Sequence, residues 1–225
     1  MDLLSSSGVR PAKSLGQNFV VDPNLTERIA RLAAVGPGDQ VLEVGPGLGS
    51  LTLALHATGA FVTAIEIDHR LAEVLAETLP DDVRVIRGDA LEIDLAALFP
   101  LSLVGRASGV TMVANLPYNV ATPLVMGVLE NAPIVRRLVV MVQREVAERF
   151  AAPPGNKIYG AVSARIAYFA TTSVEMVVPP EVFFPKPNVA SAVIEITRRE
   201  TPAVDPALAD YDEIVTLLRH GFGNR

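Results

Sequence analysis

Apolar runs and amphipathic segments alternate along the chain. Short runs rich in valine, isoleucine and leucine indicate buried strands, whereas apolar residues spaced three and four apart indicate helices. Strands are expected from near residue 40 and at 61–67, 83–87, 110–114, 138–142, 173–178 and 190–197. Helices are expected at 25–34, 51–55, 69–79 and 121–130, after residue 145, from 160 to about 170, and at 210–219. This alternation predicts an α/β fold with a mostly parallel sheet and helices on both of its faces.

The first expected strand of this sheet runs directly into a glycine-rich turn. Gly45, Gly47 and Gly49 follow the apolar run, and residues 51–55 then continue at helical spacing. Gly45 and Gly47 allow the backbone to turn sharply and to approach a ligand where a Cβ atom would collide. A strand, a tight loop and a helix form the opening unit of a nucleotide-binding sheet. An ordinary strand-to-helix turn remains an alternative, because glycine patterns alone are weak evidence.

Polar side chains stand where three later strands are expected to end. Glu66, Asp89 and Asn115 each close such a strand, and ligands of parallel sheets bind beyond the carboxyl ends of the strands. An acid about 20 residues after the glycines can bind ribose hydroxyls. The carboxylate of Asp89 can accept a hydrogen bond from an adenine amine, which suits S-adenosylmethionine, or it can cap a helix instead. The three strand ends together favour a nucleotide-like ligand.

The segment Asn115-Leu116-Pro117-Tyr118 indicates the chemistry. The exocyclic amine of adenine is a poor nucleophile, because its lone pair is delocalised into the ring. The side-chain oxygen of Asn115 and the backbone carbonyl of Leu116 can hold both amine hydrogens and direct the lone pair outward. Pro117 fixes the backbone between them, and Tyr118 offers a ring on which the base can stack. Taken alone, the same four residues are also compatible with an ordinary turn.

Composition narrows the classes of function. The 225 residues carry a net charge of −6, contain no cysteine and include only three histidines. Disulfides and thiolate chemistry are therefore excluded, and we expect no metal site. Since no apolar run is long enough for a membrane span, we expect a cytoplasmic protein with no membrane partner. The acidic balance argues against bulk electrostatic attraction to nucleic acid.

Six motifs occur in an order that resembles one known family. They are Ser14-Leu15-Gly16-Gln17-Asn18-Phe19, Glu43-Val44-Gly45-Pro46-Gly47-Leu48-Gly49, Glu66-Ile67-Asp68, Gly88-Asp89-Ala90, Asn115-Leu116-Pro117-Tyr118 and the stretch from Phe183 to Val193. From about residue 10 to residue 198 the chain is similar to the small-subunit ribosomal RNA adenine dimethyltransferases. The resemblance implies a Rossmann-like class I methyltransferase fold with a seven-stranded sheet.

The resemblance also implies an activity and its residues. It implies transfer of methyl groups from S-adenosylmethionine to adenine N6 in small-subunit ribosomal RNA, within a precursor particle. Separately from the resemblance, we expect a monomer that uses no metal. The donor would be bound by Asn18, Val20, Gly45, Glu66, Asp89, Ala90 and Asn115. The target adenine would be held by Asn115 and Leu116 and stacked between Tyr118 and Phe183. Phe183 can equally be a core residue. Lys157, Lys186, Arg198 and Arg199 could contact phosphates, or each could be an ordinary solvated side chain.

Two departures from the family pattern stand out. Lys186 replaces an expected proline between Pro185 and Pro187, which puts the rigidity of that loop in doubt. Family members continue into a basic segment and a small helical domain. We therefore expect residues 201–225 to form a linker and the start of a truncated helical region. The catalytic domain is expected over residues 15–200, and a flexible arm over residues 1–14.

Three other functions remain open from the sequence. One is methylation of large-subunit ribosomal RNA, as in the related macrolide-resistance enzymes, whose motifs overlap heavily with these. Another is a non-catalytic assembly or transcription factor that keeps the donor fold, although an intact Asn115–Tyr118 segment argues against it. The weakest is methylation of a small molecule.

Overall fold

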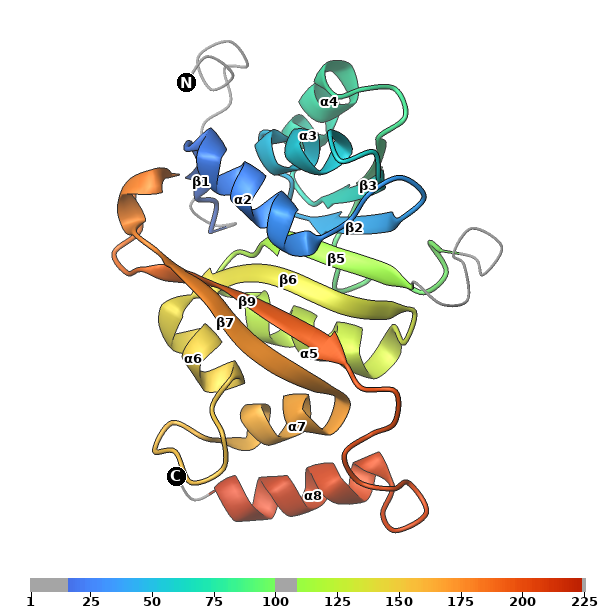
Figure 1. Ribbon diagram of the computed structural model, residues 1–225, viewed down its shortest axis with the longest axis vertical. Coiled ribbons are helices and arrows are strands. Elements are labelled where there is room, and N and C mark those ends of the chain that lie inside the picture. Colours follow the sequence, from blue (N-terminus) through green and yellow to red (C-terminus); the bar gives the residue numbers. More distant parts are fainter. Residues whose placement is uncertain (1–15, 100–108, 224–225) are drawn as a thin grey trace.

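The computed structural model describes residues 16–99 and 109–223. The arm expected over residues 1–14 lies outside them. Within the described residues, seven strands form one sheet in the order β4-β3-β2-β5-β6-β9-β7 (Figure 1). They are β2 (Gln40–Val44), β3 (Phe61–Glu66), β4 (Arg84–Arg87), β5 (Val110–Asn115), β6 (Val135–Gln143), β7 (Ala170–Val178) and β9 (Ser191–Arg198). The first five strands in the sequence are parallel, and β9 runs antiparallel between β6 and β7. The predicted mostly parallel sheet is confirmed.

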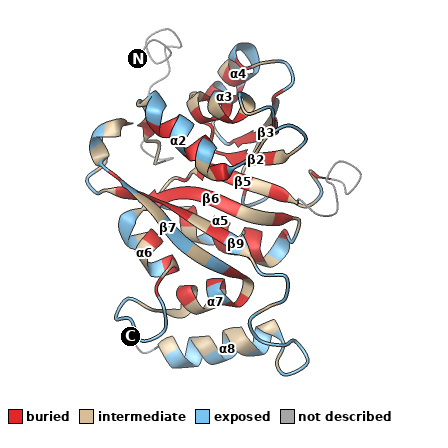
Figure 2. Ribbon diagram, in the orientation of Figure 1, coloured by how far each residue is buried: buried red, intermediate tan, exposed pale blue. Residues whose placement is uncertain are grey.

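Helices cover both faces of this sheet, as the alternating pattern predicts. One set comprises α2 (Pro23–Ala33), α3 (Ser50–His56) and α4 (His69–Thr78), and the other comprises α5 (Ala121–Asn131), α6 (Arg144–Phe150) and α7 (Ala161–Phe169). Successive strand residues point to opposite faces, so Val41 packs with the first set and Leu42 with the second. The central strands are buried on both faces, which explains their unbroken apolar runs (Figure 2).

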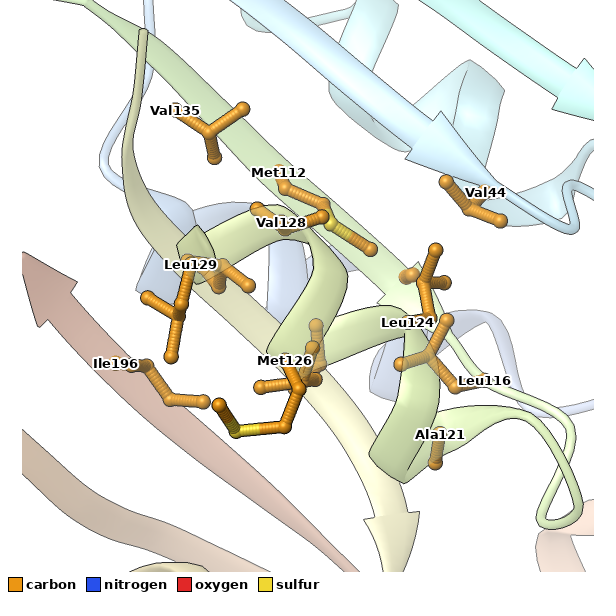
Figure 3. Packing of buried hydrophobic residues seen from close by; sticks show 14 of the residues in the cluster. Val44, Met112, Leu116, Ala121, Leu124, Met126, Val128, Leu129, Val135 and Ile196 are labelled. Atoms are coloured by element: carbon orange, nitrogen blue, oxygen red, sulfur yellow. The ribbon is translucent and has the colours of Figure 1, made fainter. Parts of the chain in front are cut away.

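The core beneath α5 extends to the carboxyl ends of β2 and β5. Figure 3 shows Leu116 and Leu124 close to one another near the end of β5, with Val44 at the end of β2. All three side chains belong to the buried cluster and also line the cavity described below. The floor of that cavity is therefore the edge of a close-packed core, which holds it rigid.

A two-stranded sheet joins the start of the described chain to the proline-rich loop, residues 179–187. β1 (Phe19–Val20) pairs antiparallel with β8 (Phe183–Phe184), and Val20 lies opposite Phe183. The N–H of Val21 extends the ladder by donating to the carbonyl of Val182, in the short helix η2 (Pro180–Val182), at 2.9 Å. The hydrophobic pattern does not predict this sheet, because two-residue strands carry no periodicity.

The last described helix, α8 (Tyr211–Phe222), packs against α7 (Figure 1). Asp210 caps its start by accepting from the N–H of Glu213 at 2.8 Å. The hydroxyl of Tyr211 donates to the carboxylate of Glu130 and accepts from Arg165. Burial raises the pKa of Tyr211 to about 12. The helix predicted at 210–219 is confirmed, and the domain boundary at residue 200 remains a prediction.

Candidate functional site

A cavity of about 320 Å³ opens beyond the carboxyl ends of the central strands. β2 pairs with β3 on one side and with β5 on the other, so the chain changes direction across the sheet at this point. Ligands of open α/β sheets bind in the crevice that such a change creates. Five segments supply most of the wall: residues 16–20, 43–48, 65–67, 88–91 and 115–120.

The glycine-rich turn contacts β3 through Gly45 and β1 through Gly47. Gly45 donates its N–H to the carbonyl of Ile65 at 2.9 Å. Gly47 adopts a φ of +60°, and a Cβ atom there would lie 3.0 Å from the ring of Phe19. A side chain at position 47 would therefore be strained and would push β1 away from the turn.

Glu66 is buried at the end of β3, where backbone groups grip its carboxylate. Its Oε1 accepts from the N–H of Asp68 at 2.9 Å, and its Oε2 accepts from the N–H of Gly47 at 3.2 Å. Burial raises the pKa of Glu66, and the two backbone donors oppose this shift. Each carboxylate oxygen can accept more than one hydrogen bond, so Glu66 keeps acceptor capacity on the cavity wall.

Asp89 caps no helix, because residues 90–99 form turns, and its role toward an adenine amine stays a prediction. Its Oδ1 accepts from the N–H of Leu91 at 2.9 Å and so shapes the turn after β4, while the residue also lines the cavity. Ala90 lies beside it on the same wall. Ile67 and Leu91 are each 46% exposed, and both line the cavity. Sequence reasoning missed these two residues, although Ile67 directly follows Glu66 and Leu91 comes shortly after Asp89.

Glu43 is a further acidic residue of the cavity that sequence reasoning did not assign. It lies within β2 and is buried, and its Oε2 has no hydrogen-bond partner among the described residues. Burial raises the pKa of Glu43 to about 8, and the nearby charge of Glu66 acts in the same direction. The sequence signal that could have identified Glu43 is an acid between the apolar residues Leu42 and Val44 of a predicted strand. Carboxyl groups are rarely buried unless they are paired with another group or bind a ligand.

The Asn115–Tyr118 segment is anchored at several points. The side-chain Nδ2 of Asn115 donates to the carbonyl of Asn18 at 2.9 Å, which leaves Oδ1 as the acceptor end of the amide. The N–H of Leu116 donates to the carbonyl of Met141 at 3.0 Å. The carbonyl of Pro117 accepts from the N–H groups of Val120 and Ala121, where α5 begins. This turn is therefore fixed in place before any ligand binds.

The wall thus brings Asn18, Val20, Gly45, Glu66, Asp89, Ala90, Asn115, Leu116 and Tyr118 together. Their grouping agrees with the expected donor and target positions, but the roles themselves stay predictions.

Comparison with known proteins gives the family. The family described as ribosomal RNA adenine dimethylase matches residues 9–220. The chain belongs to this family. The ribosomal RNA small subunit methyltransferase A of Moorella thermoacetica is 44% identical over 99% of this chain and 78% of its own length. The protein of the same name from Thermobifida fusca is 45% identical over 99% of the chain and 76% of its own length.

Solved structures of RNA methyltransferases share the fold of this dimethylase family member. A dimethyladenosine transferase from Plasmodium falciparum superposes with a TM-score of 0.76 at 27% identity, over 91% of this chain and 70% of that one. The 23S rRNA methyltransferase ErmE superposes with a TM-score of 0.74 at 28% identity, over 91% and 80% of the two chains. The resemblance and the expected class of methyltransferase fold are therefore confirmed, and the chain is an rRNA adenine methyltransferase.

The structure does not bring Phe183 to the cavity of this dimethylase. Its side chain is 4% exposed and packs in the hydrophobic cluster that includes Val178 and Val193, whereas Phe184 is 51% exposed. The cavity wall includes neither ring. Adjacent residues of a strand face opposite ways, so burial of one ring exposes the other. Tyr118 is the aromatic residue of the Asn115–Tyr118 segment that lines the wall.

Both arginines that could contact phosphates donate hydrogen bonds to backbone carbonyls of the protein. Arg198 donates to the carbonyls of Val128, Leu129 and Val135, so it holds the end of α5 against the sheet. Arg199 donates to the carbonyl of Ala167. All three nitrogens of the Arg198 guanidinium are thus engaged, so it is not positioned as a free phosphate ligand. Arg199 is exposed and donates through its Nε, and its contact with phosphate stays a prediction, as does that of Lys157. Lys186 forms a 2.7 Å ion pair with Glu181 across the proline-rich loop, which ties the two ends of that loop together.

Two absences concern the described part of the chain. Residues 16–99 and 109–223 contain no group of acidic, histidine or cysteine side chains that could hold a metal ion. None of the helices in these ranges is both long and apolar enough to cross a membrane.

Proposed function

We propose that this chain transfers methyl groups from S-adenosylmethionine to the N6 amine of adenines in small-subunit ribosomal RNA, forming N6,N6-dimethyladenine during ribosome biogenesis. The observation that carries the proposal is the convergence of Glu66, Asp89 and Asn115 on one cavity beside the Asn115–Tyr118 turn. We place the activity in the cytoplasm, on a precursor particle, and expect the enzyme to act as a monomer.

The donor side of the cavity fits an adenosine with a charged amino-acid part. Glu66 offers carboxylate acceptors for the ribose hydroxyls, and Asp89 offers an acceptor for the adenine amine. Ile67 and Leu91 supply exposed apolar surface for the flat ring. Gly45 and Ala90 leave room for close approach, and the wall is completed by Asn18, which directly precedes β1, and by Val20 in β1. When bound, the donor supplies a methyl group activated by a sulfonium.

The target side needs to position an amine more than to remove its proton. Oδ1 of Asn115 and the carbonyl of Leu116 would accept the two amine hydrogens, which directs the nitrogen lone pair toward the methyl group. The ring of Tyr118 would stack on the base, a contact of about 1–3 kcal/mol. Positioning of this kind contributes through orientation. The methylated nitrogen is positively charged and strongly acidic, so it passes one proton to solvent water without a residue that titrates near neutrality. Phe183 would supply a second ring only by leaving the core position that it occupies here.

The relatives favour the small subunit over the large one. A third relative named ribosomal RNA small subunit methyltransferase A, from Cutibacterium acnes, is 50% identical over 88% of this chain and 66% of its own length. The 23S rRNA methyltransferase ErmE is 28% identical. Because substrate choice within one fold depends on residues outside the shared motifs, the higher identity supports the small-subunit substrate.

A direct assay tests the assignment. Small-subunit precursor particles and free large-subunit RNA are incubated separately with the protein and labelled S-adenosylmethionine, and the nucleosides are resolved by mass spectrometry. Dimethyladenosine is expected from the particles alone, and Asn115→Ala serves as the inactive control. Label in the large-subunit RNA alone would support the macrolide-resistance type of activity instead. Label in neither substrate would contradict the proposed function.

A further inference from the structure

Tyr118 is tethered by one buried serine that does not line the cavity. The hydroxyls of Tyr118 and Ser191 lie 2.9 Å apart, within hydrogen-bond distance. Ser191 is 1% exposed and is the first residue of β9. The bond joins two segments that are 73 residues apart in the chain. It therefore links the Asn115–Tyr118 turn to the strand that directly follows the proline-rich loop.

The surroundings make Ser191 a rigid anchor. In the sheet it lies opposite Gln143, the last residue of β6, and Val178, the last residue of β7. The preceding residue, Ala190, accepts a 3.0 Å hydrogen bond from the N–H of Arg144, which begins α6. A strand paired on both sides cannot easily move. The serine hydroxyl is therefore held in a fixed position beside the hydroxyl of Tyr118.

Without this hydrogen bond the tyrosine ring would have more freedom. Tyr118 lies on a turn, is only partly buried and lines the cavity, so its backbone alone does not set the plane of the ring. Rotation about the side-chain torsions would swing the ring toward or away from a base stacked on it. A hydrogen bond at the tip of the ring removes that freedom and leaves the ring face available.

We propose that Ser191 is a positioning residue, which holds the Tyr118 ring in the orientation that stacks on the target adenine. The inference rests on the proposed function, because it assumes that the base stacks on Tyr118. Ser191 acts through Tyr118 and touches neither donor nor base. Its loss therefore weakens capture and alignment of the target while donor binding stays intact.

The test compares Ser191→Ala with Tyr118→Phe, which removes the same hydrogen bond and keeps the ring. Each is expected to lower the single-turnover methylation rate about three- to tenfold, the usual value of one neutral hydrogen bond. The double variant is expected to be no slower than either single one, since both remove one interaction. Donor affinity by calorimetry is expected to stay within about twofold of the wild type. Ser191→Thr, which restores a hydroxyl, is expected to recover most of the rate.

A structural readout separates positioning from simple destabilisation. RNA that carries 2-aminopurine at the target position loses fluorescence when that base stacks, and Ser191→Ala is expected to reduce the quenching. Ser163 provides the matched control: it is also 1% exposed, and its hydroxyl donates to the carbonyl of Arg149 at 2.5 Å. Ser163→Ala is expected to leave both quenching and rate unchanged.

The possible failures are distinguishable. If Tyr118→Ala stays active, the proposed stacking function fails. If Tyr118→Ala is inactive while Ser191→Ala and Tyr118→Phe match the wild type, only the positioning role of Ser191 is overturned. Rate losses that multiply in the double variant would also overturn it. If Ser191→Ala does not fold, Tyr118→Phe still decides the matter, because it leaves Ser191 in place.

Discussion

The side-chain amide of Asn115 donates a 2.9 Å hydrogen bond to the backbone carbonyl of Asn18, 97 positions earlier in the chain. The bond orients the amide and fixes the segment that leads into β1. That segment also packs Phe19 against Gly47 and pairs Val20 with Phe183. The residues expected to bind the donor and those expected to hold the target base therefore share one hydrogen-bonded frame.

Asn115→Ala is expected to lower the methylation rate at least tenfold, a loss of about 1.4 kcal/mol in transition-state stabilisation. The reason is that Asn115 orients the reacting amine, an interaction realised mainly in the transition state. Single-turnover assays on precursor particles measure the rate, and calorimetry is expected to show a smaller change in donor affinity. Asn131→Ala, at the exposed end of α5, serves as the control. Retention of more than a tenth of the rate would place the site elsewhere.

Glu66→Ala is expected to weaken binding of S-adenosylmethionine at least tenfold, or about 1.4 kcal/mol. It removes the acceptors for the ribose hydroxyls and releases the N–H groups of Gly47 and Asp68, which the carboxylate now holds. Isothermal titration calorimetry measures the change. Glu77→Ala, exposed on α4, is expected to bind the donor as the wild type does. Equal affinity in both variants would remove Glu66 from the donor site.

Phe183→Ala is expected to lower the free energy of unfolding by about 3–5 kcal/mol, the usual cost of truncating a buried phenylalanine. Phe184→Ala, at an exposed position, is expected to change it by about 0.5 kcal/mol or less. Urea denaturation of both variants measures the difference. If the two changes in stability are equal, the burial of Phe183 does not describe the protein in solution. The methylation rate of the folded fraction then tests its proposed second role against the target base.

The sheet could be predicted from the sequence, because strand and helix periodicities are local signals. The positions of Glu66, Asp89 and Asn115 followed from the rule that parallel strands end at one edge. The pairing of β1 with β8 could not be predicted, since it depends on contacts between distant two-residue segments.

Individual side chains of the site were harder to predict than its location. Alternation along β8 requires one of Phe183 and Phe184 to face inward, but the sequence does not say which. Ile67 and Leu91 were missed because exposed apolar residues are common at any surface. Ser191 could not be linked to Tyr118 because its partner is set by the register of β9 against β6 and β7.

The stability of the protein is expected to depend on pH through Glu43. Burial raises the pKa of this carboxyl group from 4.5 to about 8 in the folded state. Between these pH values the unfolded chain has lost the proton and the folded chain keeps it, so raising the pH favours unfolding. Glu43 therefore lowers the free energy of unfolding by about 1 kcal/mol for each pH unit in this range. The decrease levels off above pH 8.

Glu43→Gln tests this dependence, because glutamine has nearly the same shape and cannot ionise. The variant is expected to lose stability less steeply than the wild type as the pH rises from about 5 to 8, and to be the more stable protein at the upper end. Burial also raises the pKa of Glu66, so this residue lowers the stability of both proteins in the same way as the pH rises. The difference between the two stability curves therefore reports on Glu43. Urea denaturation at pH 5, 6, 7 and 8 measures both curves. Parallel curves would show that the Glu43 carboxylate is already ionised in the folded protein, with a partner for Oε2 that compensates for its burial.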